Sequence, residues 1–329
     1  MSKVLITTVP FASKDKRPLK MLDEAGVDYE VNPLNKKLTE EELGHLISEY
    51  SVLIAGTEPI TAKVIEAAPK LKLISRVGIG LDNVDLLKAN SRGIKVSYTP
   101  DAPSPAVAEL TLGLIFSLIR ALHVSNHEMH KGIWHRSFGR RISDLTIGVI
   151  GVGRIGTRVL ELINAVGNPR LLVNDLSLKT HLNGKMPLEW VSKERILKEA
   201  DIVTVHVPLT KHTKNMIRKK ELLSMKSDAS IINTARGGII NEQDLHDVLR
   251  SEHLSGAAID VFDLEPYKGP LCELDRCILT AHMGSMSVDC RNRMEYEATE
   301  EVIRFLSGER LERMVPLSEY ELQSNMVLK

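Results

Sequence analysis

Short apolar runs alternate with amphipathic stretches along the first hundred residues. The apolar runs are rich in β-branched residues and too short for helices, which is typical of strands covered on both faces. The stretches between them carry apolar residues at helical spacing. The predicted strands are 3–8, 29–31, 52–55, 73–75 and 95–97, and the predicted helices are 20–25, 39–49, 61–67 and 85–90. This alternation predicts parallel strands joined by right-handed crossovers in a small α/β domain.

A proline-rich segment, residues 98–105, follows this region. It contains Pro100, Pro103 and Pro105, and proline is excluded from helix interiors and central strands, so we interpret the segment as a linker. Residues 106–122 are almost continuously apolar. They predict one long helix, buried on most sides, between domains or at a subunit contact.

The strand and helix alternation resumes near residue 145. The predicted strands are 147–150, 171–174, 202–207, 230–233, 256–259 and 278–280. An amphipathic helix is predicted over 289–306, and the polar tail 319–329 is expected to be loosely held. The predicted fold class is α/β, with doubly wound parallel sheets.

The run Gly-Val-Gly-Arg-Ile-Gly at 151–156 lies between a predicted strand and a helical pattern. In such a turn Gly151 permits the tight bend, Gly153 lets a pyrophosphate approach, and Gly156 lets the helix pack closely. Asp175 ends the next strand about 20 residues further on, where a carboxylate binds the ribose 2′-OH of NAD. The pattern predicts an NAD site that rejects the 2′-phosphate of NADP, unless Asp175 is only a turn residue.

Composition narrows the classes of partner. The formal net charge is +0 and no long run has one sign, so nothing indicates a nucleic-acid partner. No uninterrupted apolar run reaches the ~18 residues that span a bilayer, so we expect no membrane association and a cytoplasmic location. The three cysteines form no CxxC pair, which argues against a disulfide framework or a structural zinc site.

Three polar residues follow predicted strands in the second half: Arg236, Glu265 and His282. Ligands in open α/β sheets bind at the carboxyl ends of strands, and a guanidinium can bind a carboxylate through two parallel hydrogen bonds. Alone, each residue is better explained as a surface arginine, a solvated glutamate or a partly buried histidine. The ordered set favours an active site.

Four motifs in order resemble the NAD-dependent D-2-hydroxyacid dehydrogenase family. They are Gly-Val-Gly-Arg-Ile-Gly at 151–156, Asn-Thr-Ala-Arg-Gly-Gly at 233–238, Asp-Val-Phe-Asp-Leu-Glu-Pro at 260–266 and Ala-His-Met-Gly at 281–284. The resemblance extends to 76–85 and 107–109, so it covers most of the chain. Runs 78–85 and 132–136 look like the phosphoglycerate dehydrogenase branch, here without a regulatory domain.

The resemblance implies two Rossmann-like domains, the smaller one discontinuous. The substrate (catalytic) domain would comprise residues 1–101 plus 285–329, and the NAD-binding domain residues 102–284. The resemblance further implies that Arg236 binds the carboxylate of a 2-keto acid, that His282 donates the proton and that Glu265 hydrogen-bonds His282. A carboxylate beside the ring stabilises the imidazolium, so a proton is available near neutral pH. A homodimer is also implied, and the long apolar helix is consistent with it.

The resemblance also implies which residues bind cofactor and substrate. The cofactor-binding residues would be Gly151, Gly153, Arg154, Ile155, Gly156, Asp175, His206, Pro208, Thr213, Thr234, Ala235, Asp260 and Gly284. The substrate-binding residues would be Arg76, Val77, Gly78, Arg136 and Arg236.

The favoured substrate pair is 3-phosphoglycerate and 3-phosphohydroxypyruvate, with Arg76, Arg136, Arg140 and Arg141 as candidate phosphate ligands. The alternative is an unphosphorylated 2-keto acid such as hydroxypyruvate or glyoxylate. It arises because Ala55 ends a strand where phosphoglycerate dehydrogenases usually carry an arginine that faces the substrate.

Two other classes remain open. His123, His127 and His130 share roughly one helix face, near His135, and could ligate zinc, although polar decoration of a helix is the preferred interpretation and we expect no metal. A non-catalytic NAD(H)-sensing corepressor is the other class, and the acid–base pair argues against it.

Overall fold

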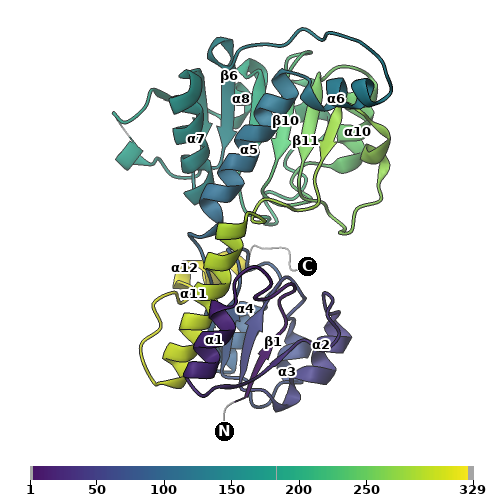
Figure 1. Ribbon diagram of the computed structural model, residues 1–329. Coiled ribbons are helices and arrows are strands. Elements are labelled where there is room, and N and C mark those ends of the chain that lie inside the picture. The colour runs from purple at the N-terminus through teal and green to yellow at the C-terminus, as the bar shows by residue number, and fades with distance from the viewer. Residues whose placement is uncertain (1–2, 183, 325–329) are drawn as a thin grey trace. The chain divides into compact units, whose positions relative to one another are not determined.

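The computed structural model describes residues 3–182 and 184–324 (Figure 1). The chain divides into two compact units. Unit 1 comprises Met1–Pro103 and Met286–Lys329, and unit 2 comprises Ser104–Ser285. Each unit is built on its own parallel sheet, so the predicted α/β class is confirmed.

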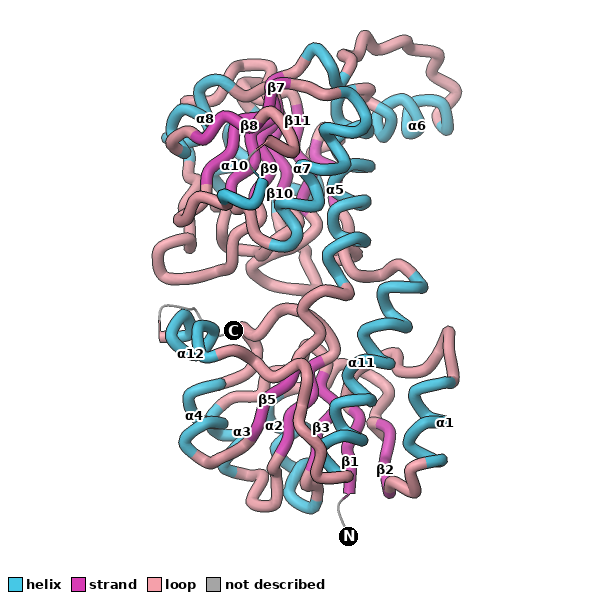
Figure 2. The backbone as a smooth tube through the Cα atoms, turned by 90° about the vertical axis from the view of Figure 1, so that its left-hand side faces the viewer, coloured by secondary structure: helices cyan, strands magenta, loops and turns pink. Residues whose placement is uncertain are grey.

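Unit 1 contains a five-stranded parallel sheet in the order β2-β1-β3-β4-β5. Its strands are β1 (Lys3–Ile6), β2 (Asp28–Val31), β3 (Val52–Ala55), β4 (Leu73–Arg76) and β5 (Lys95–Ser97). Its helices are α1 (Arg17–Glu24), α2 (Glu40–Leu46), α3 (Ala62–Glu66), α4 (Leu86–Ser91), α11 (Val288–Leu306), α12 (Leu317–Gln323) and the 3-10 helix η1 (Ile47–Glu49). Figure 2 shows α1 and α11 on one face of the sheet and α3 and α4 on the other. Every residue of β3 and β4 is buried. This explains the unbroken apolar run of β3, whereas β4 also buries the polar residues Ser75 and Arg76.

Unit 2 contains a seven-stranded parallel sheet in the order β12-β11-β10-β9-β6-β7-β8. Its strands are β6 (Thr146–Ile150), β7 (Arg170–Asn174), β8 (Leu188–Trp190), β9 (Ile202–Val205), β10 (Ser230–Asn233), β11 (Gly256–Ile259) and β12 (Cys277–Leu279). Its helices are α5 (Pro103–Ile119), α6 (Leu122–His130), α7 (Arg154–Gly167), α8 (Lys193–Glu199), α9 (Lys219–Leu223), α10 (Glu242–Arg250) and the 3-10 helices η2 (Ile142–Asp144), η3 (Thr180–Leu182) and η4 (Pro270–Glu273). In Figure 1, α5 and α7 cover one face of this sheet and α8 and α10 the other.

The strand order of unit 2 reverses beside β6. The chain runs from β6 outward to β7 and β8, and then returns to place β9 on the other side of β6. Ligands in doubly wound sheets bind at such a reversal, beyond the carboxyl ends of the strands. The edge formed by the ends of β6, β9, β10, β11 and β12 is therefore the place to look for a site.

The predicted linker and long helix were partly wrong. Helix α5 begins at Pro103, because proline is tolerated in the first turn, where backbone N–H groups have no helical acceptor. It ends at Ile119, whose carbonyl oxygen accepts the N–H of Arg140 at 3.0 Å. Ala121 then takes a left-handed conformation with a φ of 49°, and α6 starts in a new direction.

Two further elements differ from expectation. Strand β8 is not predicted by the apolar pattern, because it is three residues long and contains Glu189. The tail was expected to be loose, but residues 317–323 form α12. The buried Gln323 side chain donates to the carbonyl oxygen of Val84 at 2.6 Å and accepts the N–H of Leu87 at 3.1 Å. Residues 325–329 of the predicted tail lie outside the described residues.

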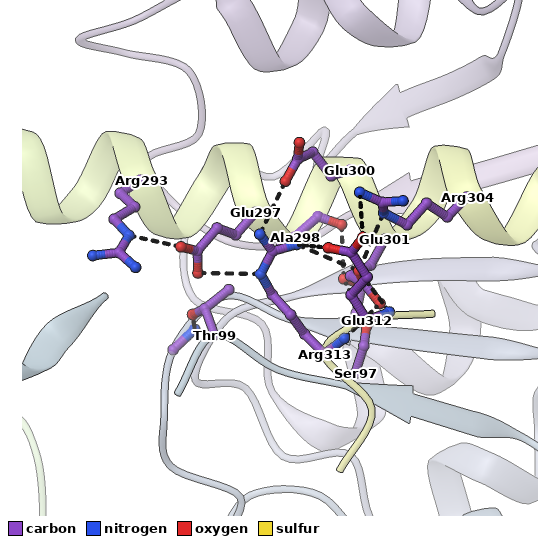
Figure 3. Close-up of polar contacts among 12 residues, drawn as sticks. Ser97, Thr99, Arg293, Glu297, Ala298, Glu300, Glu301, Arg304, Glu312 and Arg313 are labelled. Atoms are coloured by element: carbon purple, nitrogen blue, oxygen red, sulfur yellow. Dashed lines mark hydrogen bonds and ion pairs between the residues drawn. The ribbon is translucent and has the colours of Figure 1, made fainter. Parts of the chain in front are cut away.

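Charged side chains join α11 to the segment that follows it, in unit 1. Glu301 is 1% exposed, accepts the N–H of Arg313 at 3.2 Å and lies 3.4 Å from the Arg313 Nη1. Arg313 also pairs with Glu300 at 3.2 Å and with Glu297 at 3.7 Å (Figure 3). The carbonyl oxygen of Arg313 accepts the N–H of Tyr98, just beyond β5, at 3.1 Å. The network therefore fixes this returning segment beside the sheet.

Within the described part of the chain, no single helix is long and apolar enough to cross a membrane. Only the bent pair α5 and α6, taken together, reaches that length and composition.

Candidate active site

The glycine turn between β6 and α7 leaves room for a phosphate. Gly151 has a φ of +96°, and a Cβ there would lie 2.4 Å from the carbonyl oxygen of His206. A Cβ on Gly156 would lie 2.0 Å from the carbonyl oxygen of Gly151, so α7 packs directly on the turn. The Cβ position of Gly153 has open space around it. Arg154 and the next residue, Ile155, start α7, so their N–H groups point toward this opening, which fits a dinucleotide diphosphate.

Asp175 follows β7, and its carboxylate turns back to the glycine turn. Its Oδ2 accepts the N–H of Val152 at 2.8 Å and its Oδ1 accepts the N–H of Ser177 at 3.0 Å. Burial raises the pKa of Asp175, but these hydrogen bonds and the charge of Lys179 outweigh it and hold the pKa below its ordinary value. The carboxylate is therefore ionised near neutral pH, the form in which both oxygens act only as hydrogen-bond acceptors.

The loop after β9 places an uncharged histidine beside the glycine turn. The Nε2 of His206 lies 2.9 Å from the Thr204 hydroxyl, and burial lowers the pKa of His206 to about 3. The Thr213 hydroxyl donates to the carbonyl oxygen of Pro208 at 2.6 Å, which closes this loop on itself. Sequence reasoning missed Thr204, although residues two apart along a strand point to the same face.

Arg236 lies in the loop after β10. The Asn233 side chain closes this loop, since its amide donates to the carbonyl oxygen of Arg236 at 2.8 Å and its Oδ1 accepts the N–H of Ala235 at 3.0 Å. The half-buried Arg236 guanidinium donates to the carbonyl oxygen of Ala235 at 2.7 Å. Thr234 is buried, and its hydroxyl lies 2.9 Å from that of Thr111 on α5. The loop thus holds a cation at the carboxyl edge of the sheet.

Asp260 directly follows β11 and is completely buried. Its Oδ1 accepts the Thr280 hydroxyl at 2.6 Å and the N–H of Met283 at 2.7 Å, and its Oδ2 accepts the N–H of Gly284 at 2.9 Å. Burial raises the pKa of Asp260, although the hydrogen bonds oppose this effect. Asp260 therefore shapes the loop that carries His282.

His282 and Glu265 form a hydrogen-bonded pair beyond β12 and β11. The His282 Nδ1 lies 2.9 Å from the Glu265 Oε2 and 3.2 Å from its Oε1. An ionised carboxylate can only accept, so Nδ1 carries a hydrogen and Nε2 is the ring atom that this contact leaves for a substrate. The side chains are 42% and 31% exposed, which leaves them accessible to a small molecule. Because β10, β11 and β12 are neighbours, Arg236 lies on the next loop along the same edge.

Arg76, Val77 and Gly78 lie at the carboxyl end of β4 in unit 1, and their polar groups are engaged there. The N–H of Val77 donates to the carbonyl oxygen of Ala55 at 2.9 Å, and the N–H of Gly78 donates to the Thr99 hydroxyl at 2.8 Å. The buried Arg76 guanidinium donates to the carbonyl oxygen of Val77. A substrate at these residues would therefore have to compete with existing hydrogen bonds.

Arg136 does not lie with the other predicted site residues of unit 2. It belongs to an exposed segment, 131–141. Arg140, near the end of this segment, pairs at 3.1 Å with Asp201, which directly precedes β9. That contact lies at the amino edge of the sheet, opposite the edge that carries Arg236.

The histidines of α6 and its neighbourhood were the other candidate for chemistry. Among residues 3–182 and 184–324, no three His, Cys, Asp or Glu side chains are grouped so as to hold a metal ion. His135 pairs with Glu128 at 3.2 Å, and burial lowers the pKa of His123.

Comparison with known proteins identifies the family. The family model described as "D-isomer specific 2-hydroxyacid dehydrogenase, NAD binding domain" matches residues 112–284. The chain is 34% identical over 284 residues to a hydroxypyruvate reductase of Thermotoga maritima, covering 84% of this chain and 92% of that protein. It is 36% identical over 321 residues to a D-3-phosphoglycerate dehydrogenase of Methanocaldococcus jannaschii, covering 96% of this chain but 59% of that longer protein. A glyoxylate reductase of Thermofilum pendens is 34% identical over 279 residues, which is 82% of each chain.

Solved structures agree with this assignment. The TT0316 protein from Thermus thermophilus is 34% identical and superimposes with a TM-score of 0.87, covering 95% of this chain and 100% of that one. A D-lactate dehydrogenase from Aquifex aeolicus, complexed with NAD and lactic acid, is 25% identical with a TM-score of 0.82 and 99% coverage of both chains. The chain belongs to the D-isomer specific 2-hydroxyacid dehydrogenase family, with its Rossmann-like fold. It is an oxidoreductase that uses NAD.

Proposed function

We propose that this protein interconverts a 2-keto acid and a D-2-hydroxy acid, with His282 as the proton donor. The contact of 2.9 Å between His282 and Glu265 is the observation that carries the proposal. It orients the ring and leaves Nε2 for the substrate oxygen, the arrangement required of a general acid. A protein that only senses NAD(H) has no need of this pair, so a corepressor is not favoured.

Each residue of the edge has a distinct task in reduction. Arg236 binds the substrate carboxylate through two parallel hydrogen bonds, and its charge polarises the adjacent carbonyl. The Nε2 of His282 donates a proton to the carbonyl oxygen, while Glu265 stabilises the imidazolium before the transfer. NADH supplies the hydride for the carbonyl carbon when it is bound. In the reverse direction the neutral His282 accepts the hydroxyl proton.

We further propose that NAD binds along the carboxyl edge of unit 2. The open turn at Gly153 would receive the diphosphate, and Asp175 would accept a hydrogen bond from the adenosine ribose. The other residues proposed to line the cofactor are Gly151, Arg154, Ile155, Gly156, His206, Pro208, Thr213, Thr234, Ala235, Asp260 and Gly284.

The Asp175 assignment predicts a strong preference for NADH over NADPH. A carboxylate repels the 2′-phosphate of NADPH, so kcat/KM should be at least about 100-fold higher with NADH, a coupling of roughly 3 kcal/mol. Asp175→Ser should narrow this ratio, whereas Asp28→Ser, at an exposed position in unit 1, should leave it unchanged. Equal kcat/KM values for the two cofactors in the unmodified protein would exclude the role given to Asp175.

For the substrate we propose an unphosphorylated 2-keto acid such as hydroxypyruvate or glyoxylate. At the carboxyl edge of unit 1, Ala55 provides no cation, and it lies opposite Arg76 in the β3–β4 pair. Near it the Glu58 carboxylate, 1% exposed, accepts the N–H of Gly56 at 2.9 Å. This buried carboxylate opposes the attraction that the Arg76 guanidinium at the same edge would exert on a phosphate dianion. Arg140, a candidate phosphate ligand, is instead paired with Asp201.

A phosphorylated substrate remains the second candidate. The identity of 36% with a D-3-phosphoglycerate dehydrogenase, over 96% of the chain, favours it. Arg76 would then be the candidate phosphate ligand, since Arg136 lies in the exposed segment 131–141 rather than on a loop of the carboxyl edge.

The substrate proposal predicts the ranking of a panel of keto acids. With NADH, we expect kcat/KM for hydroxypyruvate or glyoxylate to exceed that for 3-phosphohydroxypyruvate by at least about tenfold, which corresponds to ~1.4 kcal/mol. The measurement is steady-state NADH oxidation at one pH and ionic strength. A preference for the phosphorylated compound would reverse the order of the two candidates.

The homodimer and the cytoplasmic location remain predictions. Exposed apolar side chains lie on α6 and the following segment, among them Leu122, Met129, Trp134 and Phe138, and such groups mark interfaces. We propose that two copies pair through this surface. A mass in solution of a single chain, 36.6 kDa, would contradict the dimer.

A further inference from the structure

The loop between β11 and η4 carries Glu265 and is held at several points. The N–H of Phe262 donates to the Glu265 Oε1 at 3.0 Å, so the backbone of the loop fixes the carboxylate that faces His282. The N–H of Asp263 donates to the Glu242 Oε1 on α10 at 2.7 Å. A glutamate side chain that is 31% exposed would otherwise sample several rotamers. The direction of the carboxylate therefore depends on the position of Phe262.

Phe262 is enclosed between a backbone contact and an aromatic ring. A Cβ on Gly237, the residue after Arg236, would lie 1.9 Å from the carbonyl carbon of Phe262, so the two loops touch there. On the other side, the Tyr267 ring stacks on the Phe262 ring with centroids 4.1 Å apart and an angle of 17° between planes. Phe262 itself is 4% exposed. Its N–H is thus held in place by the loop after β10 and by Tyr267.

Tyr267 is in turn fixed by the start of η4. Its hydroxyl oxygen accepts the N–H of Leu271 at 3.3 Å. A Cβ on Gly269 would lie 2.3 Å from this oxygen, so the chain closes tightly over the ring. Tyr267 therefore links the fully buried Leu271 to the loop that carries Glu265.

We propose that Tyr267 is a positioning residue that acts through Glu265: its stacking on Phe262 holds the N–H that aims the Glu265 carboxylate at His282. The proposal rests on the acid role given above to His282. Tyr267 touches neither reactant. The stacked ring surface contributes more than the hydroxyl, because it fixes Phe262 directly, whereas the hydrogen bond from Leu271 to the hydroxyl is long, at 3.3 Å.

A double-mutant cycle separates this role from a general loss of structure. Tyr267→Leu should lower kcat about 5- to 10-fold, in line with the loss of one aromatic pair, while the NADH Kd and the Tm of unit 2 change little. Tyr267→Phe keeps the stacked ring, so its kcat should stay within about twofold of that of the unmodified protein. In a Glu265→Ala background, Tyr267→Leu should lower kcat by less than about twofold, because alanine has no side-chain acceptor for the Phe262 N–H and the route of action is already lost.

The proposal would be overturned if the effect of Tyr267→Leu on kcat did not depend on the residue at position 265. If Tyr267→Leu lowers kcat equally in both backgrounds, or not at all, Tyr267 does not act through Glu265. Tyr267→Met, a flexible residue of similar reach, replaces the leucine variant if that variant fails to fold.

A proton NMR measurement, which needs no turnover, tests the role of Tyr267 independently of the proposed reaction. The His282 Nδ1–H, bonded to a carboxylate, should give a downfield proton resonance, identified by its loss in His282→Gln. The resonance should persist in Tyr267→Phe and broaden or vanish in Tyr267→Leu. Its persistence in Tyr267→Leu would overturn the positioning role even if the protein reduces no keto acid. Loss of the resonance in Tyr267→Leu but not in Tyr267→Phe would support the positioning role, even if the protein reduces no keto acid.

Discussion

Replacing His282 is expected to lower kcat for 2-keto acid reduction by about 10²- to 10⁴-fold without weakening NADH binding. The Nδ1 of His282 faces Glu265, so Nε2 is the ring atom that can deliver the proton. The contacts proposed for the diphosphate and the adenosine ribose of NADH lie on the glycine turn and at Asp175, and the contacts proposed at Asp260 and Gly284 do not involve the His282 side chain. His282→Asn is the preferred variant, because His282 has a φ of 51° and asparagine tolerates this left-handed conformation.

Steady-state kinetics and NADH fluorescence titration test the role of His282 together. His45→Ala is a matched control, since the His45 side chain is 80% exposed in unit 1. The control should keep the kcat of the unmodified protein. A near-normal kcat in His282→Asn would show that another group delivers the proton.

Arg313→Met is expected to reduce the free energy of unfolding of unit 1 by about 1–3 kcal/mol, because Glu301 loses one charged partner but keeps Arg304 at 3.7 Å and the N–H groups of residues 312 and 313. Glu301 is 1% exposed and lies 3.4 Å from the Arg313 guanidinium, so the variant leaves a buried carboxylate without this partner (Figure 3). Arg304, 3.7 Å from Glu301, is too distant to replace its hydrogen bonds.

Chemical denaturation of the variants, followed by circular dichroism, measures this loss. Arg310→Met, at an exposed position in the same segment, should change stability by no more than about 0.5 kcal/mol. Adding Glu301→Gln to Arg313→Met should recover part of the loss, because the buried charge that has lost its nearest cation is then absent. Equal stabilities of the Arg313 and Arg310 variants would mean that the network contributes little.

The sheets could be predicted from the sequence because their strands are buried on both faces. Runs such as 52–55 and 256–259 are apolar at every position, and the structure makes them β3 and β11 with the predicted bounds. The break between α5 and α6 could not be predicted from the local sequence. The carbonyl oxygen of Ile119, the last residue of α5, accepts the N–H of Arg140, which lies 21 positions later in the chain. Helix α12 was missed because Gln323 is buried through hydrogen bonds rather than through apolar character.

The candidate site also has features that the sequence predicts and features that it does not. The positions of Arg236, Glu265 and His282 beyond strand ends indicated a common edge of a sheet, and the structure places them on adjacent loops. The contact between Glu265 and His282, 17 residues apart, depends on the register of β11 and β12 and on Asp260. Tyr267 has no signal in the sequence, because its role arises from a ring that it meets only in the folded loop.

The most direct test of the proposed reaction is the oxidation of NADH by the purified protein with hydroxypyruvate, combined with the chirality of the product. The proposed reaction predicts one D-glycerate for each NADH oxidised. Formation of L-glycerate, or binding of NADH without oxidation by any 2-keto acid, would contradict it.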